Sequence, residues 1–405
     1  TIIGGIAIGG MLFDILYWSF GFLRAGTGGL TAQAFGRNDM ADCGRNLIRG
    51  IGAALAISLA LILLQWPFQK LCFTFVKSSG EVKELALQYY FIRIWAAPAT
   101  LSLMSLRGWF IGMQDSFSSM CTDVVVNGMN VLASILLSRR IGFAGIAWGT
   151  VLAQYSGLLF AMSVIFVKYR HVPFNLKDTR KHLTEGMGRF FSVNADLFIR
   201  SLALVVVYIS FTSLAAGYGD LPLSGATIMM KLLLLFSYFT DGFAYAGEAL
   251  TGRFFGERNK TMVNGTVRRV FIWSFGIGLL FIALYYVAGD PLLRLLTDDV
   301  SVREYCHNFF YWLLPMPIVG CAAFTWDGIY IGATASRPMR DSNLASVAGF
   351  FLVYYLGKTL MLNSGYDSAA APVHILLSAY FTHLLVRSLW QTFAWPRSLK
   401  SSFPA

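Results

Sequence analysis

Eleven long apolar segments follow one another along this chain, and they constrain its fold more than any other feature. Hydropathy, with breaks at Gly, Pro and clustered charges, places them at 1–35, 44–68, 85–113, 117–138, 142–167, 188–216, 221–255, 262–288, 303–333, 341–362 and 369–395. A helix that crosses a bilayer needs about 20 mostly apolar residues. The sequence therefore predicts an all-α membrane protein with about 11 transmembrane helices, kinked near Pro98, Pro315 and Pro317.

The composition argues against soluble classes of protein. Only 13% of the 405 residues are charged and 56% are hydrophobic, whereas a soluble domain carries about 25% charged residues. Such a chain cannot cover a globular surface with polar groups, which disfavours a soluble enzyme, a disordered protein and a secreted disulfide scaffold. The net charge of +11 does not indicate a nucleic-acid partner, because Lys and Arg lie in short gaps between apolar segments.

The basic residues are divided unevenly between alternate gaps. One set of gaps contains eighteen Lys and Arg, and the other set contains seven. Because cytoplasmic loops carry the excess of positive charge, we expect the first set to be cytoplasmic. The longest polar gap is also basic, and it predicts a cytoplasmic linker at 171–187 between an N-terminal bundle at 1–170 and a C-terminal six-helix bundle at 188–405.

The two halves repeat the same motifs at a fixed separation. Gly108-Trp-Phe-Ile-Gly112 matches Gly328-Ile-Tyr-Ile-Gly332 with an offset of 220 positions, and Phe35-Gly36 matches Phe255-Gly256 at the same offset. Two pseudo-symmetric halves around a central loop are typical of secondary transporters, which bind substrate near the midplane. The counterpart of segment 188–216 would precede Thr1. We therefore expect the first bundle to lack its opening helix.

Four separated motifs resemble those of one transporter family. They are Gly21-Phe-Leu-Arg-Ala-Gly26 through Gly36 with Asn38-Asp39, Asn194-Ala-Asp196 with Arg200, Asp241-Gly242 through Glu248, and Asp327-Gly-Ile-Tyr-Ile-Gly-Ala-Thr334. In this order they resemble the multidrug and toxic compound extrusion (MATE) transporters, and in particular the DinF-like branch.

The resemblance implies a fold and an activity. We expect two six-helix bundles with a drug-binding cavity between them, and efflux of lipophilic or cationic compounds driven by inward H+ or Na+. We also expect a monomer in the bacterial inner membrane, with a small-molecule substrate, membrane lipid around it and no nucleic acid. The family carries a coupling Asp in its first helix, which no residue of this sequence matches.

Ionisable and amide side chains inside the predicted helices mark candidate sites. A charge at the bilayer centre costs about 2.5–3.5 kcal/mol on insertion scales, so each should face a cavity or a partner. A desolvated carboxylate holds a proton more readily, and a nearby cation opposes this. We assign ion coupling to Asp241, Asp327 and Asp196. The candidate cavity residues are Asn194, Arg200, Lys231, Glu248, Asp123, Asn127 and Asn130.

Structural roles fit several of these residues equally well. Asp196 and Arg200 are four residues apart and could pair within one helix. Asp123, Asn127 and Asn130 share a helix face that could form hydrogen bonds between helices. The remaining alternatives are a counter-charge role for Lys231, a gate or solvated position for Glu248, helix packing for Asp327 and close GxxxG packing for the paired glycines.

Motifs for soluble chemistry are not found in the sequence. Gly357-Lys358-Thr359 lacks the upstream Gly of a phosphate loop, no HExxH or GxSxG occurs, and the five cysteines show no CxxC spacing. We therefore expect no enzyme, no metal and no cofactor. Two other functions remain open, namely a lipid-linked oligosaccharide flippase of the same superfamily, which would need a cavity rich in Arg and Lys, and a non-transporting membrane scaffold or receptor.

Overall fold

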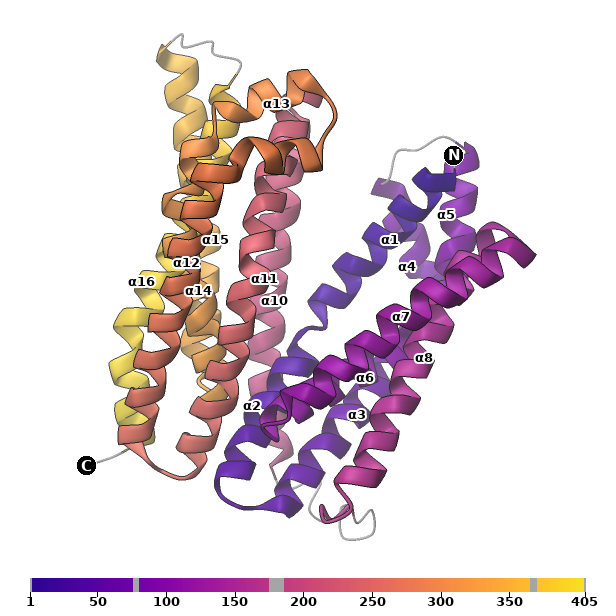
Figure 1. Cartoon of the computed structure of the whole chain (residues 1–405), viewed down its shortest axis with the longest axis vertical. Helices are drawn as coiled ribbons and strands as arrows, with labels where there is room; N and C mark the ends of the chain where they lie inside the picture. Colours follow the sequence, from indigo (N-terminus) through magenta and orange to yellow (C-terminus); the bar gives the residue numbers. More distant parts are fainter. Residues whose placement is uncertain (1, 76–79, 175–185, 365–369, 404–405) are drawn as a thin grey trace. The chain divides into compact units, whose positions relative to one another are not determined.

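The computed structural model describes residues 2–75, 80–174, 186–364 and 370–403, and these residues form helices joined by short turns (Figure 1). The centre of the predicted linker, 175–185, lies outside the described residues. The chain separates into two compact units, Thr1–Asn194 and Ala195–Ala405.

The first unit contains the first five predicted apolar segments. Its helices are α1 (Ile2–Ser19), α2 (Phe22–Gly36), α3 (Met40–Leu63), α4 (Gln65–Phe75), α5 (Gly80–Arg93), the 3-10 turn η1 (Ile94–Ala96), α6 (Ala97–Gly112), α7 (Ser116–Ile141) and α8 (Phe143–Lys168). The first segment is broken between α1 and α2, and the third is broken at η1. Pro98 lies in the first turn of α6, where its missing N–H is tolerated.

Helix α10 (Met187–Ala216) begins in the first unit and continues into the second. The second unit adds α11 (Asp220–Gly256), α12 (Lys260–Leu296), α13 (Val300–His307), the 3-10 turn η2 (Phe310–Leu313), α14 (Pro315–Gly332), α15 (Ser336–Ser364) and α16 (Ala371–Ser402). Pro315 starts α14 directly after η2, as the predicted kink requires. An unpredicted kink lies at Ala288, three residues before Pro291, because a proline ring clashes with the preceding turn.

The fold is that of an all-α membrane protein. Eight helices among the described residues are long and apolar enough to cross a bilayer. Large apolar side chains remain exposed along them, such as Leu159, Phe166 and Val167 on α8, each at least 67% exposed. Exposed apolar surface of this extent indicates lipid contact.

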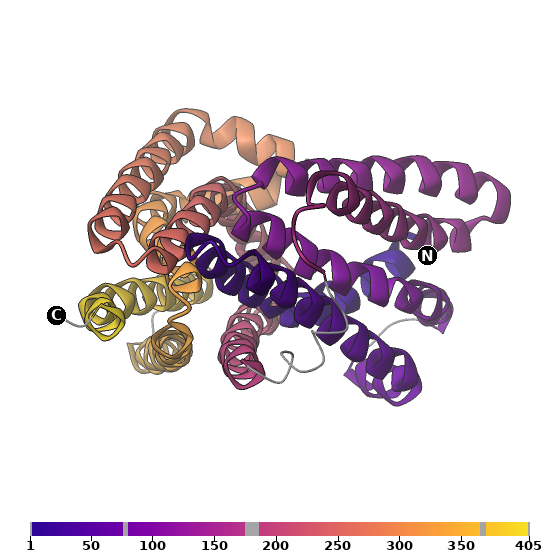
Figure 2. The same ribbon diagram turned by 90° about the horizontal axis from the view of Figure 1, so that it is seen from below.

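Tight turns and small residues hold neighbouring helices of the first unit together. Helices α7 and α8 run antiparallel and side by side in both views (Figures 1 and 2), joined at Gly142, whose φ of 64° favours glycine. An alanine Cβ at Gly149 of α8 would lie 2.6 Å from the backbone nitrogen of Ser134 on α7. The absence of a side chain at Gly149 therefore permits this close packing.

Asp115 stabilises the turn between α6 and α7. Its Oδ1 accepts a hydrogen bond from the Ser118 backbone N–H at 3.2 Å, and its Oδ2 accepts from Lys168 Nζ and Tyr169 OH at 2.7 Å each. Burial alone would raise the pKa of this carboxyl, but the hydrogen bonds from Lys168, Ser118 and Tyr169 outweigh burial and lower it. The ionised form of Asp115 therefore ties the start of α7 to the end of α8.

The offset of 220 positions reappears in the backbone of the two units. Asn38 and Arg258 both have φ of 56°, and Gln114 and Thr334 have φ of 63° and 51°. The caps at the starts of α3 and α12 also match, since the Asp39 side chain accepts from the backbone N–H of residue 42 and the Asn259 side chain accepts from that of residue 262. The repeat in the sequence therefore corresponds to a repeat in local structure.

Candidate functional site

Asp327 on α14 lies at the centre of a buried ionic cluster in the second unit. It is 7% exposed, and its Oδ2 accepts hydrogen bonds from Arg200 on α10 and from Arg387 Nη2 on α16, the latter at 2.7 Å. Its Oδ1 accepts from Gln391 Nε2 at 3.1 Å. One carboxylate therefore joins three helices, and its two arginine partners leave the cluster with one net positive charge.

The helices around Asp327 are held in place by further hydrogen bonds. Arg387 and Gln391 are four residues apart, so they project from the same face of α16. On either side of Asp327, Trp326 Nε1 donates to Thr392 Oγ1 at 2.8 Å and Tyr330 OH donates to the Gln391 carbonyl at 2.7 Å. These contacts fix the register of α14 against α16. The cluster is therefore preorganised by its packing.

Asp196 forms a second ionic group at the start of α15. Its Oδ1 accepts from Arg340 Nη1 at 2.6 Å, and its Oδ2 accepts from Ser336 Oγ at 2.8 Å. Arg200, one turn along α10, pairs instead with Asp327. The ion pair within α10 that the spacing of Asp196 and Arg200 allowed is therefore not formed, and each residue binds a different helix.

The other predicted residues of the second unit lie on α11. Glu248 is fully buried, Asp241 is half-buried and Lys231 is exposed. Asp241 and Glu248 are seven residues apart, so they lie on the same side of the helix.

In the first unit, two of the three polar residues predicted on α7 bind neighbouring helices. Asp123 forms an ion pair with Arg107 of α6 at 2.6 Å. Asn130 Oδ1 accepts from Thr150 Oγ1 of α8 at 3.3 Å. Asn127 is exposed and donates to the carbonyl of Asp123 in its own helix. The hydrogen-bonding alternative therefore describes Asp123 and Asn130.

Asn194 lies at the end of the first unit, against α2. Its Nδ2 donates to the Phe190 carbonyl at 2.8 Å, and its side chain occupies the space that a Cβ at Gly26 would need. Gly26 thus makes room for Asn194.

The remaining motif glycines fall into two groups, those packed against the backbone of a neighbouring helix and those at helix ends or in open space. Cβ atoms at Gly108 and Gly112 would collide with the carbonyls of Arg24 and Gly28 on α2, and those at Gly328 and Gly332 would collide with the carbonyls of Ala244 and Glu248 on α11. Each colliding pair is displaced by 220 positions, so the GxxxG segments make the same close helix contact in both units. Gly21 precedes α2, Gly36 and Gly256 end α2 and α11, and Gly242 has open space around it.

Two partners of Asp327 were not among the residues predicted from the sequence. Arg387 and Gln391 lie inside the last predicted apolar segment and are 2% and 0% exposed. An arginine in an apolar helix is unfavourable unless it has a partner, and that signal was available from the sequence. The identity of its partner was not, since Asp327 is 60 residues away along the chain.

Comparisons with known proteins agree with this architecture. The MatE family model matches residues 1–136 and 197–356. DNA damage-inducible protein F of Escherichia coli (strain K12) is 31% identical over 354 residues, which are 86% of this chain and 77% of that protein. The probable multidrug resistance protein NorM of Photorhabdus laumondii is 21% identical over 74% of this chain and 66% of its own length.

A solved structure shows the same fold. It is the outward-facing conformation of a multidrug resistance MATE family transporter of the MOP superfamily, with a TM-score of 0.81 at 18% identity, and the match covers 98% of this chain and 88% of that one. The family model, the bacterial relative and the fold agree, and the chain belongs to the MatE family of membrane transporters.

Proposed function

We propose that this protein is a secondary active exporter of lipophilic, often cationic small molecules, driven by an inward flow of H+ or Na+ through alternating access. Two similar proteins carry names that include multidrug resistance, which supports this substrate class. A membrane potential of about 150 mV supplies about 3.5 kcal/mol for each charge that enters, which is enough for coupled export.

The observation that carries the coupling proposal is the buried carboxylate of Asp327, shared between α10, α14 and α16. Anything that neutralises this carboxylate weakens its bonds to Arg200 and Arg387, which belong to two other helices. Ion uptake at Asp327 would therefore change how three helices are held together. A coupled exporter needs this link between ion occupancy and helix position.

The surroundings of Asp327 favour H+ over Na+ as the coupling ion at this position. A hard metal cation needs several oxygen ligands, whereas the Asp327 oxygens face the N–H groups of Arg200, Arg387 and Gln391. A proton needs only one carboxylate oxygen, which becomes available when one arginine moves away. We propose Asp241 and Asp196 as further coupling candidates. Asp196 is held by a single arginine, Arg340.

Dye efflux from cells that express the protein tests this function. We expect export to stop when the proton gradient is collapsed and to persist when only the sodium gradient is collapsed. Asp327→Asn should abolish coupled export, and Asp241→Asn and Asp196→Asn test the other candidates. Asp220→Asn, the same change at an exposed position at the start of α11, is the matched control.

Protein amount and drug binding must be measured for each variant. Full export by the Asp327→Asn protein would exclude this carboxylate as the coupling group. If all three carboxylate variants retained export, the coupling site would lie elsewhere. Absence of any efflux by the wild-type protein would favour a scaffold or receptor, and translocation of lipid-linked oligosaccharide would favour a flippase.

A further inference from the structure

His383 on α16 is a deeply buried histidine beside the ionic cluster of Asp327. It is 1% exposed and lies one helical turn before Arg387, which is 2% exposed. Its ring donates a hydrogen bond to the backbone carbonyl of Ser346 on α15, whereas its Nδ1 has no hydrogen-bond partner among the described residues. The N–H is therefore on Nε2, and neutral His383 keeps on Nδ1 a lone pair that can accept a further hydrogen bond.

Arg387 lacks the kind of partner that His383 can supply. Its Nη2 donates to Asp327 Oδ2 at 2.7 Å, and its Cζ lies 5.8 Å from the centre of the Phe324 ring. Its Nε has no acceptor within the described part of the chain. Side chains on a helix lean toward the N-terminus of that helix, so Arg387 leans toward His383. Among the described groups, an unpartnered donor and an unpartnered acceptor thus lie one turn apart on α16.

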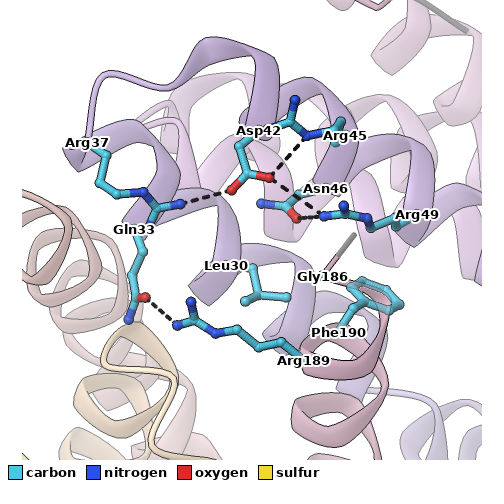
Figure 3. A pocket seen from close by; sticks show the side chains of 10 residues that line it. All are labelled: Leu30, Gln33, Arg37, Asp42, Arg45, Asn46, Arg49, Gly186, Arg189 and Phe190. Atoms are coloured by element: carbon cyan, nitrogen blue, oxygen red, sulfur yellow. Dashed lines mark hydrogen bonds and ion pairs between the residues drawn. The ribbon is translucent and has the colours of Figure 1, made fainter. Parts of the chain in front are cut away.

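The first unit contains a similar arrangement in which the hydrogen bond is formed (Figure 3). On α3, Arg49 Nη1 lies 3.6 Å from Asp42 Oδ1 and donates to Asn46 Oδ1 at 3.1 Å. Asn46 is a neutral acceptor one turn before its arginine, as His383 is on α16. Residues three or four apart on a helix are neighbours, so Arg387 can reach His383 in the same way.

We propose that His383 is a positioning residue that accepts a hydrogen bond from Arg387 when the Asp327 carboxylate is neutralised. This inference rests on the proposed ion coupling at Asp327. A proton that binds an oxygen of Asp327 removes the negative charge that holds Arg387, and a buried arginine without a partner is strongly destabilising. If Arg387 turns from Asp327 to His383 Nδ1, its guanidinium group stays hydrogen-bonded, and His383 stays neutral throughout.

This exchange would link the charge of Asp327 to the packing of two helices. Asp327 belongs to α14, whereas Arg387 and His383 both belong to α16. The exchange therefore replaces a bond between α14 and α16 with a bond within α16. It also gives Arg387 a place to go, which frees an oxygen of Asp327 for the incoming proton.

Gln391 is the other candidate acceptor, because its Oε1 also lacks a hydrogen-bond partner among the described residues. Its Nε2, however, donates to Asp327 Oδ1 at 3.1 Å. The carbonyl oxygen of a protonated carboxyl group can still accept this hydrogen bond. Gln391 is therefore held in both states of Asp327, whereas no described group engages the Nδ1 of His383.

Thermal unfolding of the purified full-length chain in detergent tests the proposal in a double-mutant cycle. Asp327→Asn reproduces the uncharged carboxyl group, and His383→Leu removes the Nδ1 acceptor. The loss of the Ser346 bond in His383→Leu is common to both backgrounds. We expect His383→Leu to lower the unfolding temperature by about 2–4 °C more in the Asp327→Asn background than in the wild type, because Arg387 then loses its alternative acceptor.

His383→Asn distinguishes the acceptor from simple packing, because the asparagine Oδ1 takes the place of the imidazole Nδ1. The His383→Asn protein should be more stable than the His383→Leu protein in the Asp327→Asn background, and no more stable than it in the wild-type background. His307→Leu is the matched control, since it changes an exposed histidine of α13 that pairs with Asp290. It should have the same effect in both backgrounds.

The cycle requires no transport, so its failure is distinct from a failure of the coupling proposal, which dye efflux tests. Equal effects of His383→Leu in the two backgrounds would overturn the role of His383. The same stability order of His383→Asn and His383→Leu in both backgrounds would overturn it as well. If Asp327→Asn does not fold, Asp327→Ser removes the same charge with a smaller side chain and takes its place.

Discussion

Adding one methyl group to Gly328 should strongly destabilise the second unit. In Gly328→Ala the new Cβ would collide with the carbonyl of Ala244, and it would lie 2.6 Å from that residue's carbonyl carbon and 2.8 Å from its Cα. Real Cβ contacts are essentially never shorter than 3.0 Å. All three atoms belong to the α11 backbone, so no side chain can rotate away. Helices α11 and α14 must separate, which costs about 1–3 kcal/mol for overpacking.

Gly242→Ala is the matched control because it adds the same methyl group to α11 in open space. Nothing lies within 4 Å of its ideal Cβ position. Alanine has a higher helix propensity than glycine by about 0.8–1.0 kcal/mol. The control should therefore be neutral or more stable than the wild type. Both glycines lie inside helices, so the gain in helix propensity is common to both variants, and they should differ by the overpacking cost of about 1–3 kcal/mol.

Thermal unfolding in detergent, followed by fluorescence-detected size exclusion, measures the difference. Gly108→Ala tests the repeat, because its Cβ would collide with the Arg24 carbonyl in the same way. We expect Gly108→Ala and Gly328→Ala to unfold at lower temperature than the wild type. If Gly328→Ala proved as stable as Gly242→Ala, the close contact between α11 and α14 would be refuted.

Three further predictions concern charge and backbone strain, each measured by unfolding of the purified chain. Asp327→Asn should destabilise the second unit by about 3–5 kcal/mol because the buried Arg387 and the partly buried Arg200 lose their counter-charge. The added change Arg387→Gln should recover part of the loss, and no recovery would contradict the pairing. Folding lowers the pKa of the Asp115 carboxyl. Its contribution to the free energy of unfolding is therefore complete above the unfolded pKa of about 3.9 and is lost as the pH falls through the folded pKa. Asp115→Asn should therefore lower the free energy of unfolding at pH 7, and it should make this free energy fall less in acid than in the wild type. If the variant lost as much stability in acid as the wild type, the ionised Asp115 carboxylate would not stabilise the fold. Arg258→Asn should stabilise by up to about 1 kcal/mol, because Asn38 adopts the same φ of 56° and asparagine tolerates it better than arginine; a loss of stability would show that the Arg258 side chain makes a favourable contact.

The order of the helices could be predicted from the sequence because hydropathy is a local signal. Each predicted apolar segment contains helix, and the breaks next to Pro98 and Pro315 lie where a proline ring prevents a continuous helix. The kink at Ala288 follows the same rule, and Pro291 could have predicted it. The break between α1 and α2 has no proline and lies at Phe20 and Gly21, so the proline rule does not account for it.

The partners of the charged residues could not be predicted in the same way. Arg340 lies in the polar gap between the predicted segments 303–333 and 341–362, and the structure pairs it with Asp196, 144 residues away. Asp196 and Arg200 have the spacing of an intrahelical ion pair, yet each binds another helix. Sequence spacing shows which side chains share a helix face, whereas tertiary packing decides which helix that face meets.

The repeat preserves the backbone of the two units but reverses the charge at one position. Arg107 and Asp327 are separated by the offset of 220, and each precedes the first glycine of its GxxxG segment. Arg107 binds one carboxylate, that of Asp123, whereas Asp327 binds two arginines. The same local fold thus presents a cation in the first unit and an anion in the second. The net charge does not reverse in the same way, because the Arg107–Asp123 pair is neutral whereas Asp327 and its two arginines have one net positive charge. In the proposed mechanism a cation therefore reaches Asp327 only after one of these arginines has moved away, which links ion uptake in the second unit to the position of its helices.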